Sequence, residues 1–233
     1  MISVFVPCYN EEKRIEQNIL SIYHALIKLN KQFELVIVDD GSTDKTTKIG
    51  KILDENYKHI KYQYYNDGPS RRENLGKAFR TAKGDVVVFM DLDLSVDLSY
   101  VPKLLKGIEN GYDVVIGSRY KDVRAKRRFV RLVISTIYNK FMRFYLGSHI
   151  ADHQCGFKAF KKDKLLVLLD EMGYDNQLIR GWFWDVELLI RAQRKNYKIN
   201  EFPVAWKFGK QSSFDFIREL KMIPYVLKLR FRL

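Results

Sequence analysis

The chain has 233 residues and a net charge of +13, because 41 Lys and Arg residues stand against 28 Asp and Glu residues. Hydrophobic residues make up 46% of the sequence and aromatic residues 14%, which suffices for a core and excludes a wholly disordered chain. The length favours one α/β domain. No apolar run approaches the roughly 20 residues of a membrane-spanning helix, and the first residues lack signal-peptide features, so we expect neither.

Residues 1–119 alternate short apolar runs with longer amphipathic segments. The apolar runs, which we expect to be strands, are 2–6, 33–38, 60–65, 86–90 and 114–116. The amphipathic segments, which we expect to be helices, are 11–29, 43–56, 71–83 and 99–110. This order predicts a mainly parallel sheet flanked by helices. Ligands of such sheets bind at the carboxyl ends of the strands.

The second half of the sequence has a less regular pattern. Residues 128–146 are expected to form a helix with an apolar stripe on one face and Arg131 and Ser135 on the other. Beyond it we expect a turn, two helices and an edge strand, at 152–157, 162–170, 184–195 and 199–206. The last seven residues alternate with period two, which does not predict a helix. The sequence therefore indicates one domain over 1–212 and a basic amphipathic segment over 213–233.

The positive charge is concentrated in two segments. Residues 120–145 hold eight basic residues and one acidic residue, and residues 207–233 hold seven basic and two acidic residues. The rest of the chain is nearly neutral. Basic surfaces interleaved with aromatic residues bind nucleic acid, anionic membranes or phosphorylated substrates, and a plainer function of surface charge is solubility.

Acidic residues follow two of the expected strands. Asp39 and Asp40 come after the second run, and Asp91 and Asp93 come after the fourth. Two carboxylates at i and i+2 at the end of a strand can face one divalent cation, and hard oxygen ligands suit Mg²⁺ or Mn²⁺, which bridges diphosphate oxygens. The pattern therefore predicts a metal site made by Asp91 and Asp93.

Motifs along the whole chain resemble those of the family 2 glycosyltransferases, which have the nucleotide-sugar-binding GT-A fold. In the first half they are Val6-Pro7-Cys8-Tyr9-Asn10-Glu11-Glu12, Asp39-Asp40-Gly41-Ser42-Thr43-Asp44, Gly76-Lys77, Asp91-Leu92-Asp93 and Gly117-Ser118-Arg119. In the second half they are Asp152-His153-Gln154-Cys155-Gly156-Phe157-Lys158, Trp184-Asp185-Val186-Glu187-Leu188-Leu189 and Val204-Ala205-Trp206. The later motifs look most like the dolichyl-phosphate β-glucosyltransferases, with the dolichyl-phosphate mannosyltransferases next.

The resemblance implies that residues 1–119 bind the nucleotide sugar. The nucleobase and ribose would contact a set of residues near the strand ends, namely Pro7, Tyr9, Glu11, Asp39 and Asp40. Lys77 would approach the phosphates. Asp91 and Asp93 would face the ribose and hold the metal on the diphosphate.

The same resemblance places three residues of the second half beside the sugar and the metal: Gln154, Asp185 and Glu187. From the residues alone, Asp185 and Glu187 fit equally well as charges that stabilise a helix N-terminus. Asp152 fits equally well as a ligand contact or as the residue that shapes a turn.

The resemblance assigns the acceptor to residues 120–212 and to Arg119. Arg119, Arg131 and Ser135 would bind a lipid phosphate, and Asp93, Asp185, Arg119 and Arg131 would form the catalytic set. A phosphate acceptor is already anionic at neutral pH and needs no general base. Asp185 would act as a base only if the acceptor is a hydroxyl group.

The implied activity is inverting transfer of one sugar, from UDP-glucose or secondly GDP-mannose, to dolichyl or polyprenyl phosphate, with Mg²⁺ or Mn²⁺. Two alternatives remain: a family 2 glycosyltransferase acting on a glycan, a protein or another hydroxyl acceptor, and a basic nucleic-acid-binding module. We expect no nucleic-acid partner and no obligate protein partner. The two cysteines lack disulfide or metal-ligand spacing, so we expect a cytoplasmic protein that contacts the cytoplasmic face of an anionic membrane.

Overall fold

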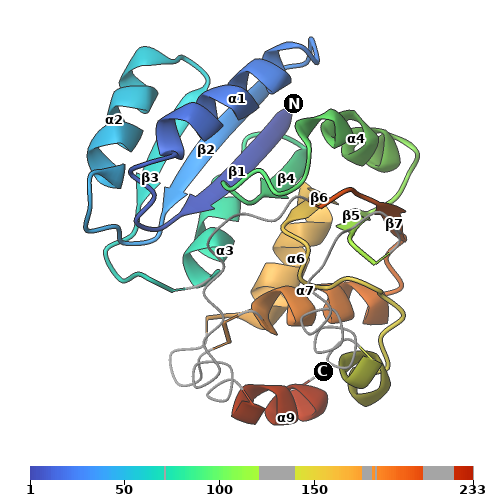
Figure 1. The fold of residues 1–233 in the computed structure, drawn as a ribbon. Coiled ribbons are helices and arrows are strands. Elements are labelled where there is room, and N and C mark those ends of the chain that lie inside the picture. The colour runs from blue at the N-terminus through green and yellow to red at the C-terminus, as the bar shows by residue number, and fades with distance from the viewer. Residues whose placement is uncertain (71, 121–139, 175–179, 182, 207–222, 233) are drawn as a thin grey trace.

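The computed structural model describes the chain except for residues 71, 121–139, 175–179, 182, 207–222 and 233 (Figure 1). Its centre is a seven-stranded sheet in the order β3-β2-β1-β4-β6-β5-β7. The strands are β1 (Ile2–Cys8), β2 (Phe33–Asp39), β3 (Ile60–Tyr64), β4 (Val86–Met90), β5 (Val114–Ser118), β6 (Phe157–Lys161) and β7 (Ile199–Pro203).

The sheet is mainly parallel, as predicted. β1 pairs in parallel with both β2 and β4, β2 with β3, and β5 with β7. Because β1, β2 and β4 run in the same direction, their carboxyl ends lie at one edge of the sheet. β7 is at the end of the strand order, which agrees with the edge position expected from Pro203.

β6 is the strand that the sequence pattern did not predict. It runs antiparallel between β4 and β5, with Ala159 opposite both Val88 and Val115. Two of its five residues are lysines, so it has no apolar run that would predict a strand. Lys158 is nevertheless fully buried. The strand carries the loop that precedes it to the end of β4.

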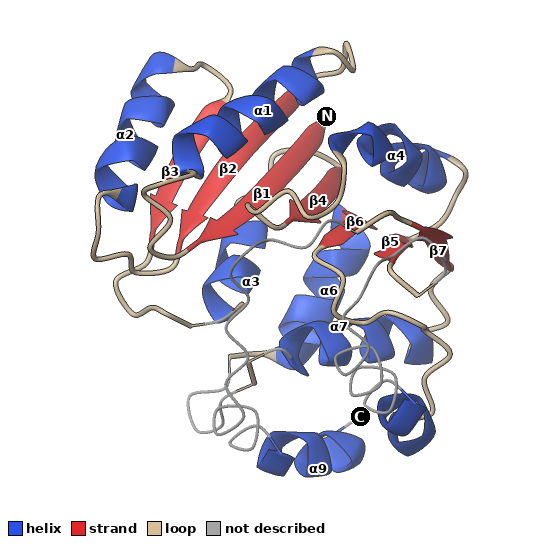
Figure 2. Ribbon diagram, viewed as in Figure 1, coloured by secondary structure: helices blue, strands red, loops and turns tan. Residues whose placement is uncertain are grey.

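Helices cover both faces of the sheet (Figure 2). They are α1 (Ile15–Ile27), α2 (Thr46–Asn56), α3 (Glu73–Phe79), α4 (Val101–Glu109), α6 (Lys162–Met172), α7 (Phe183–Arg194) and α9 (Ile223–Arg232), with a 3₁₀ turn η1 (Leu98–Tyr100) before α4. The helices α1, α2 and α4 lie over one face, while α3, α6 and α7 lie over the other. An ion pair of 2.8 Å between Lys31 and Glu109 joins the loop after α1 to the end of α4.

α9 is helical although its period-two pattern did not predict a helix. Tyr225, Val226 and Leu229 share one face of the helix and are buried. They pack in a second apolar cluster, apart from the main core, with residues from α7 and from residues 140–146, namely Met142, Leu146, Phe183, Val186 and Ile190. Residues 140–146 are helical, in agreement with the described part of the helix expected over 128–146.

Within the described residues, no helix has the length and apolar character needed to cross a membrane.

Candidate active site

The loops after β1 and β2 are joined by hydrogen bonds. The backbone N–H groups of Asn10 and Glu11 donate to Ser42 Oγ at 2.9 Å and Thr46 Oγ1 at 2.7 Å. In return, the side-chain oxygen of Asn10 accepts a 2.8 Å bond from the N–H of Thr43. These hydrogen bonds hold the two loops together as a rim along the carboxyl edge of the sheet.

Three of the predicted nucleotide-binding residues lie on this rim. Tyr9 is 42% exposed, and Pro7 and Glu11 are partly buried. Glu11 accepts a hydrogen bond from Arg14 Nη2 at 3.1 Å. An exposed aromatic ring at the end of a parallel strand is available for stacking on a ligand, so the role of Tyr9 stays a prediction that the geometry permits.

Asp39 ends β2 and is fully buried. Its Oδ1 accepts from the N–H of Ser42 at 2.8 Å, and its Oδ2 accepts from the hydroxyls of Thr47 at 3.0 Å and Tyr62 at 2.5 Å. Burial and this carboxylate both raise the pKa of Tyr62. Because protein donors engage both oxygens, the geometry favours a supporting role for Asp39, and its direct contact with a nucleotide stays a prediction.

Asp40 fastens a second loop to the same edge. Its carboxylate accepts from the N–H of Ser70 at 2.9 Å, from Ser70 Oγ at 2.8 Å and from Asn74 Nδ2 at 2.7 Å. A Cβ added at Gly68 would lie 1.9 Å from the carbonyl oxygen of Asp40, so this loop packs directly on the backbone. Asp40 therefore sets the start of α3 relative to β2.

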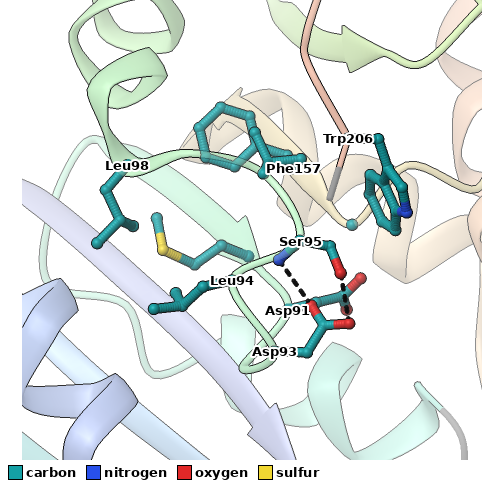
Figure 3. A pocket seen from close by; sticks show the side chains of 10 residues that line it. Asp91, Asp93, Leu94, Ser95, Leu98, Phe157 and Trp206 are labelled. Atoms are coloured by element: carbon teal, nitrogen blue, oxygen red, sulfur yellow. Dashed lines mark hydrogen bonds between the residues drawn. The ribbon is translucent and has the colours of Figure 1, made fainter. Parts of the chain in front are cut away.

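A pocket lies beside the end of β4 (Figure 3). Its lining residues are Met90, Asp91, Asp93, Leu94, Ser95, Val96, Leu98, Gly156, Phe157 and Trp206. The carboxylate of Asp93 is exposed and accepts from the N–H of Ser95 at 3.0 Å and from Ser95 Oγ at 2.6 Å. Trp206 reaches the pocket because it forms an antiparallel bridge with Val96.

Asp91 is held from two sides. Its Oδ1 accepts from Arg72 Nη2 at 3.2 Å, and a Cβ added at Gly156 would lie 1.8 Å from its Oδ2. Limited solvent access raises the pKa of Asp91, Arg72 opposes the rise, and the charges of Asp93 and Asp185 add to it. Repulsion between neighbouring carboxylates is relieved by a cation, which is the environment expected of a metal site.

The residues present fit a divalent cation bound through a substrate. Asp91 and Asp93 offer hard oxygen ligands to the pocket, and Mg²⁺ is commonly bound by one or two carboxylates together with substrate phosphates. Among the described residues, His, Cys, Asp and Glu side chains form no group of three or more that could hold a metal. Diphosphate oxygens would therefore have to complete the coordination.

Arg119, after β5, forms a buried ion pair with Asp152. Its Nε and Nη2 each lie 2.7 Å from the carboxylate, and its backbone N–H donates to the same group at 2.9 Å. Burial acts to raise the pKa of Asp152, but Arg119 holds it below its usual value. The guanidinium also lies 4.8 Å from the ring centre of Trp206. Asp152 thus orients Arg119 toward the pocket wall, which neither sequence-based interpretation of Asp152 anticipated.

Asp185 and Glu187 do not act as a pair. Asp185 accepts from Lys158 Nζ at 2.7 Å and from Arg72 Nε at 3.2 Å, on the side of α7 that faces Asp91. Glu187 instead contacts Arg180, Arg191 and Tyr225, away from that side, and ties α7 to α9. The separation follows from helix geometry, since residues i and i+2 point in different directions. These contacts do not support the placement of Glu187 beside the sugar, which stays a prediction.

The structure separates Lys77 from the carboxylate pair. Lys77 Nζ lies 2.6 Å from Asp67 and 4.4 Å from the ring centre of Tyr174, so a contact with the phosphates would require it to leave these partners. Gln154 is partly buried in the turn between Asp152 and Gly156, beside the pocket. Arg131 and Ser135 lie outside the described residues, and their roles stay predictions.

The sequence motifs assign no role to Arg72 and Lys158, two cations that contact Asp91 or Asp185 among the described residues. Arg72 lies in a segment expected to be helical, but it precedes α3 and has φ of +103°. Lys158 appeared in a motif without a role of its own. Nothing local marks either residue, because each is defined by partners more than 15 positions away in the sequence.

A mainly parallel α/β sheet with an Asp-x-Asp pair at the end of β4 defines a GT-A type of sugar-nucleotide-binding fold. Residues 3–168 match the model of the Glycosyl transferase family 2. The match covers well over half of the chain, and the protein belongs to this family and is a glycosyltransferase.

Curated relatives extend the similarity over most of the chain. This chain is 35% identical over 223 residues to glycosyltransferase AglD of Haloferax volcanii, and the match covers 94% of this chain and 35% of that protein. It is 31% identical over 229 residues to the dolichyl-phosphate beta-glucosyltransferase of Saccharomyces cerevisiae, covering 88% of this chain and 66% of that enzyme. For the dolichyl-phosphate beta-glucosyltransferase ALG5A of Trichomonas vaginalis, identity is 30% over 240 residues, covering 98% and 72%. The chain thus spans about a third of AglD and about two thirds of the yeast enzyme.

Solved structures confirm the fold. Glucosyl-3-phosphoglycerate synthase from Mycobacterium tuberculosis, in complex with UDP, superposes with a TM-score of 0.71 at 21% identity, over 99% of this chain and 80% of that chain. The same enzyme with Mn²⁺, UDP-glucose and phosphoglyceric acid gives a TM-score of 0.70 at 20% identity, over 99% and 80%.

Proposed function

We propose that this glycosyltransferase moves one sugar from a nucleoside diphosphate sugar to dolichyl phosphate or another polyprenyl phosphate, with inversion at the anomeric carbon. UDP-glucose is the favoured donor and GDP-mannose the next. The observation that carries the proposal is the Asp91–Asp93 pair in the pocket at the end of β4, in a chain whose relatives include dolichyl-phosphate beta-glucosyltransferases. An α-linked donor would then give a β-linked lipid phosphate sugar.

The donor side rests on the two carboxylates. Bound Mg²⁺ or Mn²⁺ would stabilise the negative charge of the departing nucleoside diphosphate. Both proposed metal ligands are fixed by neighbouring residues. Ser95 holds Asp93 with two hydrogen bonds, while Arg72 and Gly156 confine Asp91. A solved structure of the same fold contains Mn²⁺ together with UDP-glucose, which supports this choice of cofactor and donor.

The acceptor side rests on cations near the pocket. Arg119 carries five N–H donors, and Asp152 orients it against Trp206, a pocket residue. Asp152 takes Nε and one donor of Nη2, so the remaining N–H groups of Arg119 are the ones that would donate charge-assisted hydrogen bonds to a phosphate. Arg131 and Ser135, outside the described residues, are proposed as further contacts with the acceptor phosphate. The phosphate oxygen would need positioning behind the anomeric carbon rather than deprotonation.

The contacts of Asp185 argue against its acting as the general base that a hydroxyl acceptor would need. A hydroxyl group would need a general base within hydrogen-bond reach. The side chain of Asp185 is only 3% exposed, and a cation engages each of its oxygens. It is therefore poorly placed to take a proton from a substrate.

A basic aromatic face suits a lipid-linked acceptor. The helical residues 140–146 lie beside α9, where Tyr145 OH donates to the carbonyl oxygen of Leu227 at 3.3 Å (Figure 1). Phe144 and Phe231 on these two segments are 89% and 87% exposed. Exposed basic residues accompany them, namely Lys140, Arg143 and Lys228. We propose that this face lies on an anionic membrane surface, with the aromatic rings in the headgroup region.

A substrate panel tests the proposal. The purified chain is incubated with Mn²⁺, dolichyl phosphate and each of several labelled UDP- and GDP-sugars, and label is counted in the organic phase. We expect UDP-glucose to give the highest incorporation, in a product that mild acid hydrolyses. Incorporation only into water-soluble or protein-bound products would contradict the acceptor, and a preference for GDP-mannose would correct the donor.

A further inference from the structure

Asp185 lies between two cations beneath the carboxylate pair. Its Oδ1 accepts from Lys158 Nζ at 2.7 Å and its Oδ2 from Arg72 Nε at 3.2 Å. The side chains of Lys158, Asp185 and Arg72 are 0%, 3% and 9% exposed. Buried charges of this kind are retained only when their partners compensate them, and removal of one partner leaves the others uncompensated.

The two cations are also fixed by one aromatic ring. Arg72 Cζ lies 4.4 Å from the ring centre of Phe89, and Lys158 Nζ lies 5.3 Å from it. Phe89 is in β4, two residues before Asp91. Phe89 and Asp185 therefore hold cations from two other elements, β6 and the start of α3, directly behind the end of β4.

Arg72 connects Asp185 to Asp91. While its Nε donates to Asp185, its Nη2 donates to Asp91 Oδ1 at 3.2 Å. Arg72 has φ of +103°, a region that favours glycine, so its backbone is strained at the position that carries this side chain. Gly156 confines the other oxygen of Asp91. The orientation of the Asp91 carboxylate thus depends on where Asp185 holds the guanidinium.

We propose that Asp185 is a positioning residue for the metal site: it anchors Arg72 so that Asp91 presents its carboxylate to the divalent cation, and it neutralises Lys158, a buried cation that would otherwise weaken cation binding. The inference rests on the proposed function, because it takes Asp91 and Asp93 as the metal ligands. It assigns Asp185 no contact with the substrate and no proton transfer.

Binding of Mn²⁺ tests this role without any need for transfer. The full chain, as wild type and as Asp185→Asn, is titrated with Mn²⁺ in the presence of UDP, and free Mn²⁺ is followed by its electron paramagnetic resonance signal. Residues that orient a metal ligand typically contribute about 10- to 100-fold in affinity, so D185N is expected to bind Mn²⁺ more weakly by that factor. Wild-type affinity in D185N would overturn the proposal.

Steady-state kinetics separate positioning from base catalysis. Positioning predicts that D185N needs more Mn²⁺ for half-maximal rate by the same factor, while kcat at saturating Mn²⁺ stays within a few-fold of wild type. A base predicts the reverse, with kcat lost and the Mn²⁺ requirement unchanged, and that result would overturn the inference. If the wild type binds no Mn²⁺ with UDP, the metal site of the proposed function is wrong and the inference falls with it.

Glu187→Gln is the matched control. Glu187 is another buried carboxylate of α7 with two arginine partners, Arg180 and Arg191, but it faces α9. E187Q should therefore lower thermal stability and leave Mn²⁺ affinity unchanged. If D185N fails to fold, Lys158→Met combined with D185N removes the uncompensated charge. This double variant should still bind Mn²⁺ weakly, because Arg72 has lost its anchor, and wild-type affinity there would contradict the proposal.

Discussion

Asp93 is exposed at the pocket and contributes a carboxylate that Ser95 orients. Since it is not part of the core, replacing it tests the chemistry rather than the fold. We expect Asp93→Ala to lower transfer by about 100-fold or more, because a charge-stabilising group at the reacting diphosphate is lost. Its melting temperature should match that of the wild type.

The control for this variant is Asp97→Ala. Asp97 is an exposed aspartate four positions later, and it also accepts a backbone hydrogen bond, from the N–H of Ser99 at 2.9 Å. D97A should keep wild-type transfer in the same assay. Transfer by the wild type in excess EDTA would contradict the metal site to which Asp93 is assigned.

His153 makes a prediction about acid stability. It is fully buried next to Ser148 Oγ, and burial lowers its pKa to about 4 from an ordinary value of 6.5. Between pH 6.5 and pH 4 the unfolded chain therefore binds a proton that the folded chain does not, so stability is complete above this window and falls as the pH falls through it. Relative to His153→Gln, the wild type should lose roughly 3 kcal/mol more over the window.

Urea unfolding of both proteins at several pH values from 7 to 4 measures this difference. The carboxylates titrate in both proteins, so they cancel in the comparison. Parallel stability curves for the wild type and H153Q would contradict the buried neutral imidazole.

α9 is attached to the catalytic body through Tyr225. Tyr225 is 1% exposed, and its hydroxyl donates to Glu187 of α7, a residue that also accepts from Arg180 and Arg191. A hydrogen bond to a charged group contributes about 1.5 to 3 kcal/mol, so Tyr225→Phe should destabilise the protein by that amount. Leu227→Ala, on the half-exposed side of α9, should change stability little.

Thermal melting of the two variants tests this attachment. Equal melting temperatures for Y225F and the wild type would show that the hydroxyl does not hold α9 to α7. If L227A lowered the melting temperature more than Y225F, the assignment of Tyr225 to the buried face of α9 would be contradicted.

Element by element, the sequence predicted the parallel half of the sheet and its helices, because long apolar runs and amphipathic periods are local signals. It did not predict β6, in which Lys158 is buried only because Asp185, on a distant helix, compensates its charge. It also did not predict α9, whose buried face is defined by α7 and by residues 140–146. Both elements depend on tertiary contacts that no local pattern encodes.

The candidate site was predictable to a similar extent. Asp91 and Asp93 stood out because two carboxylates at a strand end are costly without a cation, and the structure places both in one pocket. Asp185 lies behind Asp91, but Glu187 has different partners, since helix geometry separates i and i+2. Arg72 was invisible, because its role depends on two carboxylates far away in the sequence.

The net charge of +13 of the molecule and the exposed Phe144 and Phe231 predict that the protein binds anionic membranes. Burial of a phenylalanine side chain contributes about 1.5 to 3 kcal/mol, so replacing both by serine should weaken binding to anionic vesicles at least about tenfold. Salt should weaken binding of the wild type, because headgroup attraction is screened. The double variant should melt as the wild type does.

Cosedimentation with phosphatidylserine vesicles at low and high salt measures both effects. The control is Val167→Ser, which replaces an exposed apolar residue of α6. Phe33→Ser would not serve, because Phe33 is in the core. Equal loss of binding in V167S and in the double variant would contradict the assigned face.

The proposed acceptor is a phosphate on a lipid. Its most direct test compares two acceptors that differ only in that group: dolichyl phosphate and dolichol, each incubated with labelled UDP-glucose, Mn²⁺ and the purified chain. We expect mild-acid-labile label in the organic phase with dolichyl phosphate and none with dolichol. Equal incorporation into both lipids, or incorporation into neither while UDP-glucose is transferred to a hydroxyl acceptor, would contradict it.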